Sequence, residues 1–401
     1  MSEDSYTETT TKGLGTRLGE SIKGVLVGLV MVIAAFPVLF LNEGRAIHTA
    51  RSIAECRRVV APVKSNKIDT TKDGKLVQFN GQATTTDKLS DTDLPVSAVA
   101  IKLARKTEMY QWVEEKKEET KKEVGGSEKT TTTYTYKQKW SGDVEDSSSF
   151  KKPEGHSNPG KIPYASTEWQ AANVNVGAYK LPETLVGDIS KHEALNVVEE
   201  QLKALPGEMQ ARTKVSGGGF YIGNDPGSPR VGDLRVSYSI VKPGPVSVYG
   251  RQNGDTIEAY DTSAGVPCLR LDMGTLTAAQ MFAAAESENA MLTWILRLVG
   301  ILLMCIGLYS IFKPIAVLGD VIPFIGSALA FGLGLFAGLI GVSLSLVVIA
   351  VAWVFFRPLL GIPILIIGLA GIIGLVMLGK KKKAGATPVA APAAPPAAPS
   401  R

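Results

Sequence analysis

The apolar residues of this 401-residue chain gather near its two ends, while the middle alternates between polar and apolar positions. Near the N-terminus, residues 22–41 carry a single charge, Lys23, at the edge of the segment. Twenty helical residues are long enough to cross a hydrocarbon core of roughly 30 Å. The segment lacks the small-x-small cleavage site of a signal peptide. It therefore predicts a retained transmembrane helix.

The C-terminal third is apolar in three further stretches. Arg297 is the one charge in the first of them, about one turn inside the span, where we expect it to reach the interface and act as an anchor. Lys313-Pro314 is expected to bend the chain after this stretch. A single helix over 322–356 would be ~52 Å long, more than a bilayer needs. Part of it is therefore expected to lie in the membrane interface. The predicted segments are an N-terminus at 1–21, spans at 22–41, 291–312, 329–356 and 359–378, an exported domain at 42–290, a loop at 313–328 and a disordered tail at 379–401.

Basic residues near span ends indicate the orientation, because they stay on the cytoplasmic side. Arg17 precedes the first span, Lys313 follows the second, and Lys380–Lys383 follow the fourth. Four spans place all three groups on one side, with both termini cytoplasmic. The net charge of +5 reflects this bias and requires no nucleic-acid partner.

The middle of the chain reads mainly as β-strands, rich in β-branched and aromatic residues. Asn253-Gly254 is a tight-turn pair typical of a hairpin. The charged block 114–123 interleaves lysine and glutamate, which is more typical of a solvated hairpin tip than of a charged interaction arm. Helices are expected at 191–205 and at 277–287, where Thr277 is a candidate cap. The fold class is thus an α+β membrane protein with a large β-rich exported domain between the first two spans. The expected strands are 75–84, 106–115, 131–140, 234–241, 246–252 and 256–261.

The sequence predicts no catalytic, cofactor or metal site. "HEALN" begins like a zinc-protease motif at His192, but Asn196 stands where the second histidine is required. No nucleophile elbow, P-loop or C-x-x-C motif occurs, and no span core contains an acidic residue. A transporter that couples to protons or cations usually needs such a residue. We therefore expect a protein that is not an enzyme.

Cys56 and Cys268 both fall in the exported domain, where an oxidising compartment would allow a disulfide. They are 212 positions apart, and nothing in the sequence indicates that they meet. The pairing stays open at this stage.

Glycines in the spans offer surfaces on which helices can approach closely. Gly334 and Gly338 have the G-x-x-x-G spacing, and Gly368 and Gly371 form a similar ridge. Glycine is also common in spans without any such role. The hypothesis is that these residues pack helices, within one chain or in a homo-oligomer.

Charged residues directly after the first span raise the question of a site. "FLNEGRA" places Asn42, Glu43, Gly44 and Arg45 on the exported side, where Glu43 could offset Arg45 and Gly44 could let the chain turn. The topology puts Arg357-Pro358 at the same surface. We predict that these residues lie close together as a structural collar.

Several motifs together resemble the transmembrane protein 43 family, also called LUMA, from the first span to the last. The resemblance implies four spans, a lumenal or extracytoplasmic domain and no established enzymatic activity. It also implies the animal members' residence in the endoplasmic reticulum and inner nuclear membrane, with emerin and lamins as partners. The longer third apolar segment and the Ala/Pro tail depart from that pattern. The motifs are "NEGRA" (42–46), "EMYQWVE" (108–114, with Glu108, Tyr110 and Trp112), "YTYKQKW" (134–140), "VGDLRVSYS" (231–239, with Gly232, Asp233 and Arg235), "RQNGD" (251–255) and "FFRPL" (355–359).

The leading functional hypothesis is a multi-pass scaffold that binds membrane lipid and other envelope proteins and forms homo-oligomers. The alternatives are an accessory or pore-forming subunit of a transport system, and an exported hydrolase that uses Asp233 or Glu108. The exported region has no N-x-Ser/Thr sequon. This favours a bacterial inner membrane with a periplasmic domain over the endoplasmic reticulum or inner nuclear membrane with a lumenal one.

Overall fold

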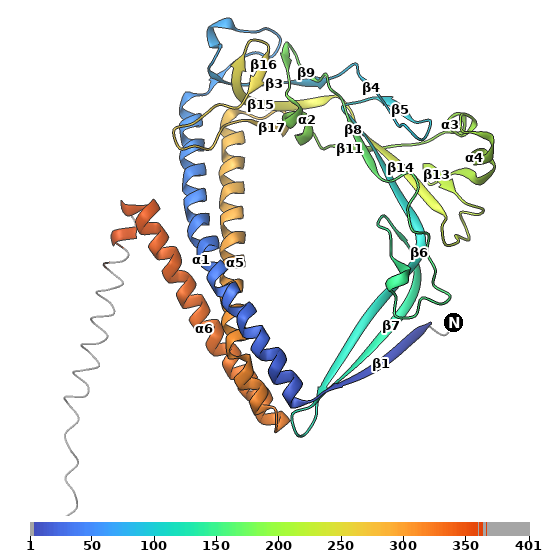
Figure 1. The fold of residues 1–401 in the computed structure, drawn as a ribbon. Helices are drawn as coiled ribbons and strands as arrows, with labels where there is room; N and C mark the ends of the chain where they lie inside the picture. The colour runs from blue at the N-terminus through green and yellow to red at the C-terminus, as the bar shows by residue number, and fades with distance from the viewer. Residues whose placement is uncertain (1–3, 360, 364–365, 367–401) are drawn as a thin grey trace, which may run out of the picture.

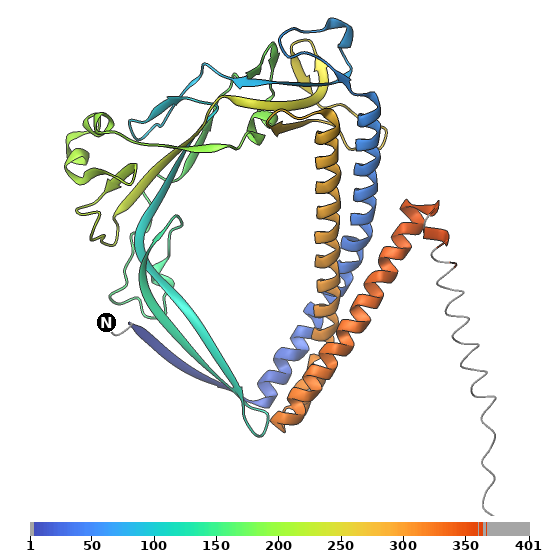
Figure 2. The same ribbon diagram turned by 180° about the vertical axis from the view of Figure 1, so that it is seen from behind.

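The computed structural model describes residues 4–359, 361–363 and 366. The chain outlines a ring: three long helices form one side, and two β-sheets extend sideways from the far ends of two of these helices (Figure 1). A long β-ribbon runs back from the sheets and meets the opposite ends of the helices, as the reverse view also shows (Figure 2).

Three helices are long and apolar enough to cross a membrane, counting the described residues alone. They are α1 (Leu14–Val59), α5 (Ala278–Gly319) and α6 (Pro323–Phe356). The prediction was four spans; the fourth, 359–378, falls almost entirely outside the described residues. The short helices are α2 (Glu183–Asp188), α3 (Glu199–Lys203) and α4 (Gly207–Arg212), with 3₁₀ turns η1 (Thr70–Lys72) and η2 (Ser147–Ser149).

The three long helices extend well beyond the predicted spans. α1 runs straight through Gly44 for 46 residues, so the expected turn there does not exist. α5 begins at the predicted cap, where Thr277 and Gln280 form a capping box, and continues through Pro314. α6 is one helix of 34 residues with Pro323 at its first turn, instead of an interfacial segment followed by a span. Proline inside a membrane helix is tolerated where neighbouring helices support the chain.

The larger sheet holds eight strands, and its central pair is β6 with β14. β6 is 21 residues long and pairs with β7 along its outer half, which forms the ribbon of the ring. The strands are β1 (Ser5–Lys12), β6 (Lys102–Lys122), β7 (Glu128–Ser141), β8 (Thr167–Gln170), β11 (His192–Leu195), β12 (Thr213–Ser216), β13 (Gly219–Ile222) and β14 (Leu234–Val241).

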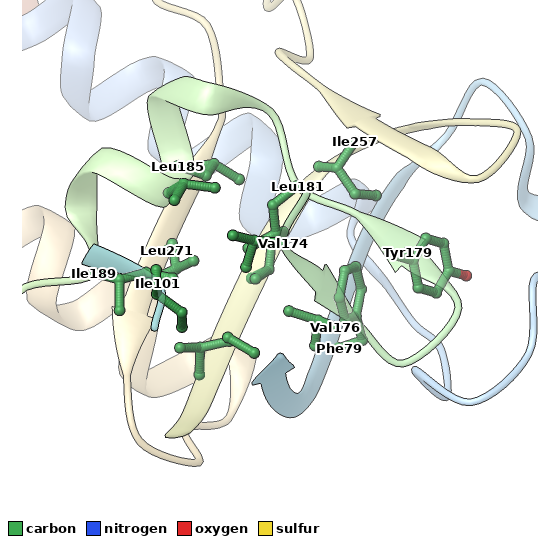
Figure 3. Close-up of a cluster of buried hydrophobic side chains, with 14 of the residues drawn as sticks. Phe79, Ile101, Val174, Val176, Tyr179, Leu181, Leu185, Ile189, Ile257 and Leu271 are labelled. Carbon is green, nitrogen blue, oxygen red and sulfur yellow. The ribbon is translucent and has the colours of Figure 1, made fainter. Parts of the chain in front are cut away.

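The second sheet holds seven strands and carries the main core. Phe79 stacks on Tyr179 with ring centroids 4.4 Å apart, among buried aliphatic side chains that include Ile257 and Leu185 (Figure 3). The strands are β2 (Ala61–Pro62), β3 (Leu76–Thr84), β9 (Asn175–Val176), β10 (Tyr179–Lys180), β15 (Gly244–Asn253), β16 (Thr256–Glu258) and β17 (Arg270–Met273), beside a separate pair, β4 (Lys88–Ser90) and β5 (Ser97–Val99).

All six predicted strands are confirmed, and Gly254 makes the predicted tight turn with φ of 60°. The predicted helix at 191–205 is wrong. Residues His192–Leu195 instead pair antiparallel with β14, and a helix of five residues follows at Glu199. The free edge of a neighbouring strand thus outweighed the local helical preference.

The first strand of the chain belongs to the larger sheet. β1 pairs antiparallel with β7, from Ser5 opposite Thr135 to Lys12 opposite Glu128. This differs from the predicted division, in which residues 1–21 and the domain at 42–290 lie on opposite sides of a membrane.

Candidate functional site

The three long helices meet at a polar junction about two thirds of the way along α1 (Leu14–Val59), beside the last turn of α6. Glu43 on α1 is 1% exposed and accepts three hydrogen bonds from the other two helices. Arg297 on α5 donates through Nε to Oε1 at 2.6 Å and through Nη2 to Oε2 at 2.8 Å. Trp353 Nε1 on α6 donates to Oε2 at 2.8 Å. One buried carboxylate therefore joins all three helices.

A second set of hydrogen bonds lies beside Glu43 and joins α1 to α5. Arg45 donates to Asn289 Oδ1 at 3.0 Å and to Thr293 Oγ1 at 3.0 Å. Asn42 donates to the carbonyl of Thr293 at 3.0 Å. Buried polar groups are costly without hydrogen bonds, so the bonds of this network favour one register of the two helices. Nε of Arg45 is buried and has no hydrogen-bond partner among the described residues. The term polar junction here means seven residues together: Asn42, Glu43, Arg45, Asn289, Thr293, Arg297 and Trp353.

Arg297 has a different role from the one expected. An arginine one turn inside a span was interpreted as an anchor that reaches the interface, with Glu43 offsetting Arg45. In the structure Glu43 binds Arg297, and the guanidinium lies 4.7 Å from the centre of the Trp294 ring. The signal that could have revealed the pair is that a charged residue inside a span usually has a partner near the same depth.

Gly44 provides close packing where a turn was expected. A Cβ atom at this position would lie 2.7 Å from the ring of Phe356 on α6. Phe356 directly precedes Arg357 and Pro358, which line a surface groove with Ile47 and Arg51 of α1. The structure thus brings the two halves of the predicted collar next to each other along α1.

Two of the predicted helix-packing glycines, Gly334 and Gly338, do not lie at close helix crossings among the described residues. A Cβ atom on Gly338 would meet nothing within 4 Å, and one on Gly334 would make ordinary contact with Tyr309. The close approach lies between Gly28 and Gly307, where a Cβ on Gly28 would be 2.6 Å from the Gly307 carbonyl oxygen. Gly368 and Gly371 lie outside the described residues.

A disulfide connects the top of α1 to the second sheet. Cys56 and Cys268 are bonded, with Cα atoms 6.7 Å apart. Around the bond, Phe282 of α5 stacks on Tyr249 of β15 at 4.9 Å, and Met281 is fully buried. The ends of α1 and α5 nearest the sheets are therefore fixed to the domain, α1 by the disulfide and α5 by apolar packing.

At the opposite end of the helices lies an ionic cluster, which we call the clasp: Arg17, Lys122, Glu128 and Asp320. Asp320 follows α5, is 1% exposed, and binds Arg17 of α1 at 2.5 Å and Lys122 of β6 at 2.7 Å. Arg17 also contacts Glu128 of β7 at 3.1 Å and donates to the Gly126 carbonyl at 2.7 Å. The clasp closes the ring.

The clasp also perturbs Asp320 itself. Burial alone would raise the pKa of the Asp320 carboxyl, but hydrogen bonds from Lys122 and Arg17 outweigh it and lower that pKa below the usual 3.8. The carboxylate is therefore ionised at neutral pH. The charged block 114–123, predicted as a solvated hairpin tip, does end in a turn, but its last lysine is bound to the helices.

The family-motif residues gather where β6 meets β14. Arg235 lies opposite Glu108 and binds it at 2.5 Å, and its guanidinium lies 4.8 Å over the Trp140 ring. The hydrogen bond from Arg235 is the main reason that the pKa of Glu108 is lowered. The pair borders a surface hollow of about 420 Å³. An ionised, paired glutamate is poorly suited to general acid catalysis.

The remaining motif residues have structural partners. Asp233 accepts hydrogen bonds from Tyr221 at 2.6 Å and from the Arg230 backbone at 2.8 Å. Gly232 has φ of 96°, which suits glycine. Tyr110 packs on Trp140 at 5.2 Å, and the Trp112 backbone binds Asn158. Within the part of the chain that the structure describes, no cluster of three potential metal ligands occurs.

Comparisons with known proteins agree with the motif pattern. A family model described as Transmembrane protein 43 matches residues 109–358. Mouse Transmembrane protein 43 is 33% identical over 358 residues, 86% of this chain and 88% of the relative. The human protein is 34% identical over 371 residues, 89% and 90% of the two chains, and the Drosophila melanogaster homolog is 31% identical over 350 residues, 86% and 91%. No solved structure matches at a significant level.

Proposed function

Because this chain belongs to the transmembrane protein 43 family, we propose that it is a multi-pass membrane scaffold that holds a β-rich domain against one face of the membrane. The domain binds other membrane or envelope proteins, and the helices associate with further copies of the chain. No chemical reaction is part of this proposal.

The polar junction carries the proposal. α1 and α5 pass from the apolar region into the domain without a break, and buried hydrogen bonds and a disulfide fix them to each other and to the second sheet. A domain held this firmly follows the position of its membrane helices. Such coupling suits a protein that presents a binding surface at a set height above a bilayer.

The surroundings of Glu108 and Asp233, the candidate catalytic carboxylates, do not favour a hydrolase. Glu108 is held by Arg235, and Asp233 by Tyr221 and the Arg230 backbone. A hydrolytic pair needs one free base or one neutral acid. A transport role has no comparable support, because Glu43 is fully bound between three helices.

We propose the endoplasmic reticulum or the inner nuclear membrane as the compartment, with the domain in the lumen. The disulfide supports an oxidising compartment for the domain. The relatives reported above come from animals, which favours this alternative over the bacterial inner membrane that the missing sequons suggested.

We further propose that the clasp is open when the helices lie in a bilayer. Closed, it draws the outer half of β6 and β7 along the same depth as the apolar helices, and that ribbon is rich in lysine and glutamate. An open sheet edge and charged side chains are not tolerated in hydrocarbon. In the bilayer, β1 then stays on the cytoplasmic side and the β6–β7 hairpin on the lumenal side.

Crosslinking tests the scaffold proposal. The full chain in its native membrane is treated with an amine-reactive crosslinker, and the products are identified by mass spectrometry. If the chain is a scaffold, we expect adducts between copies of the chain and between its domain and other membrane proteins. A chain that stays monomeric in detergent and yields no adduct in membranes contradicts it.

A further inference from the structure

A pair of grooves along the line where α1 meets α6 has a composition that neither the family nor the scaffold function explains. The first, which we call the basic groove, has a volume of about 510 Å³. Arg51 and Arg357 line it together with Ile47, Ala50 and Phe356. It lies at the end of α6 nearest the domain, where a bilayer surface would be.

The two arginines of the basic groove lack an acidic partner among the residues that the structure describes. Arg51 donates one hydrogen bond to the Phe356 carbonyl at 3.3 Å, and neither arginine forms a salt bridge with a carboxylate in the described ranges. The nearest acids on α1 are engaged elsewhere: Glu43 by Arg297, and Glu55 by the backbone and hydroxyl of Ser263. Two guanidinium groups facing one groove favour an anion with several oxygens, such as a phosphate.

The second groove, which we call the apolar groove, has a volume of about 450 Å³ and no polar surface. Phe36, Pro37 and Phe40 of α1 and Leu344, Val347 and Val351 of α6 line it. These residues are all apolar, and they lie within two helices that are long and apolar enough to cross a membrane. The groove therefore lies at hydrocarbon depth.

The two grooves are neighbours. Phe40 lines the apolar groove and Phe356 the basic groove, and the centroids of their rings are 5.3 Å apart. Along α1, the last apolar-groove residue, Leu41, and the first basic-groove residue, Ile47, are separated by about 9 Å. A glycerophospholipid covers such a distance between its phosphate and the upper part of its acyl chains.

We propose that the two grooves form one binding site for a phospholipid of the leaflet nearest the domain. The phosphate binds between Arg51 and Arg357, and an acyl chain lies in the apolar groove against Phe40 and Val347. Bound there, the lipid contacts both α1 and α6 beside the polar junction, and it stabilises their crossing.

The other candidate occupant is the chain's own apolar segment, 359–378. It contains no charged residue, and no aspartate or glutamate follows Asp320 anywhere in the sequence. That segment cannot neutralise Arg51 and Arg357. Charge complementarity therefore favours the phospholipid.

The test uses the full chain, purified in detergent and stripped of lipid, with phosphatidylglycerol added back and binding followed by native mass spectrometry. The wild type is expected to retain one lipid per chain. The double variant Arg51→Gln/Arg357→Gln is expected to bind at least ten-fold more weakly. Arg58→Gln is the matched control, because Arg58 is exposed in the last turn of the same helix and does not line the groove.

Two further measurements separate the parts of the proposal. Val347→Trp fills the apolar groove and should weaken lipid binding while the protein stays folded, as judged by an unchanged melting temperature in circular dichroism. Inorganic phosphate at millimolar concentration should not compete with the lipid.

Equal binding by the wild type and the double variant overturns the proposal. Efficient crosslinking in membranes between Val347→Cys and Leu369→Cys also overturns it, because the chain's own segment then occupies the groove.

Discussion

Glu43 and Arg297 face each other from different membrane helices, with Arg297 Nε 2.6 Å from Glu43 Oε1 and the carboxylate almost completely buried. Removing one member of a buried ion pair leaves the other charge uncompensated, at a cost of roughly 3–5 kcal/mol. Glu43→Gln should therefore lower the thermal stability of the detergent-solubilised protein. Circular dichroism at increasing temperature measures this.

The double variant Glu43→Gln/Arg297→Gln supplies the control for that prediction. It removes both charges, so it should be less destabilised than Glu43→Gln alone, and the double-mutant cycle should show a coupling well above 0.5 kcal/mol. Additive effects would mean that the two residues do not act as a pair.

The crossing of α1 and α5 at Gly28 gives a second prediction. Gly28→Ala places a Cβ 2.6 Å from the Gly307 carbonyl oxygen, so the helices must separate and stability should fall by about 1–3 kcal/mol. Gly24→Ala, one turn earlier on the same helix, meets no atom within 4 Å and should be neutral. Equal effects of the two substitutions would argue against the close crossing.

The disulfide makes a countable prediction for the three cysteines of the chain. After denaturation without reductant, an alkylating reagent should label one cysteine, Cys305, which is free. After reduction it should label all three, as mass spectrometry can count. Three labels without reductant would show that the pair is reduced in the native compartment.

Acid should open the clasp in detergent. The pKa of Asp320 is lowered in the folded protein, so its stabilising contribution is complete above its usual pKa of 3.8 and is lost as the pH falls through the lower folded value. A spin label at Lys12→Cys should become mobile in that range. With Asp320→Asn the label should already be mobile at neutral pH.

The same clasp should be open in a bilayer. Thr9 lies opposite Thr131 in the sheet, so the variant Thr9→Cys/Thr131→Cys should form a disulfide in detergent and not in membranes. The control pair Lys121→Cys/Lys129→Cys lies within the β6–β7 hairpin and should form in both. A Thr9–Thr131 bond that forms equally in membranes contradicts the open clasp.

Local patterns predicted the elements well, and long-range pairing was the part they could not supply. Alternating β-branched residues indicated six strands, and Thr277 indicated where α5 begins. Nothing local links Glu43 to Arg297, or Cys56 to Cys268, because each pair meets only after the domain between them has folded. The helix prediction at His192 failed for a related reason: the residues with which this segment pairs in β14 lie 43 to 49 positions further along the chain.

The glycines of the membrane helices also show that local sequence patterns do not predict long-range contacts. Gly334 and Gly338 have the spacing of a packing motif, whereas Gly28 and Gly307 have no motif because they lie on different helices. A spacing rule applies to one helix at a time. The polar junction sets how α1 and α5 are aligned. That alignment determines that Gly28 and Gly307 are the glycines that face each other.

During synthesis, the pairing of β1 with β7 competes with the membrane insertion of α1. The ribosome makes β1 first, and its partner strand appears only after α1 and most of the first half of the chain. By then the apolar part of α1 has left the ribosome and is ready for membrane insertion. If insertion comes first, the bilayer separates the N-terminal strand from its partner for as long as the chain stays in the membrane. If sheet pairing comes first, the chain closes as a ring before any bilayer receives it. If the clasp is open in the bilayer, as we propose, insertion of α1 therefore comes before β1 can pair with β7.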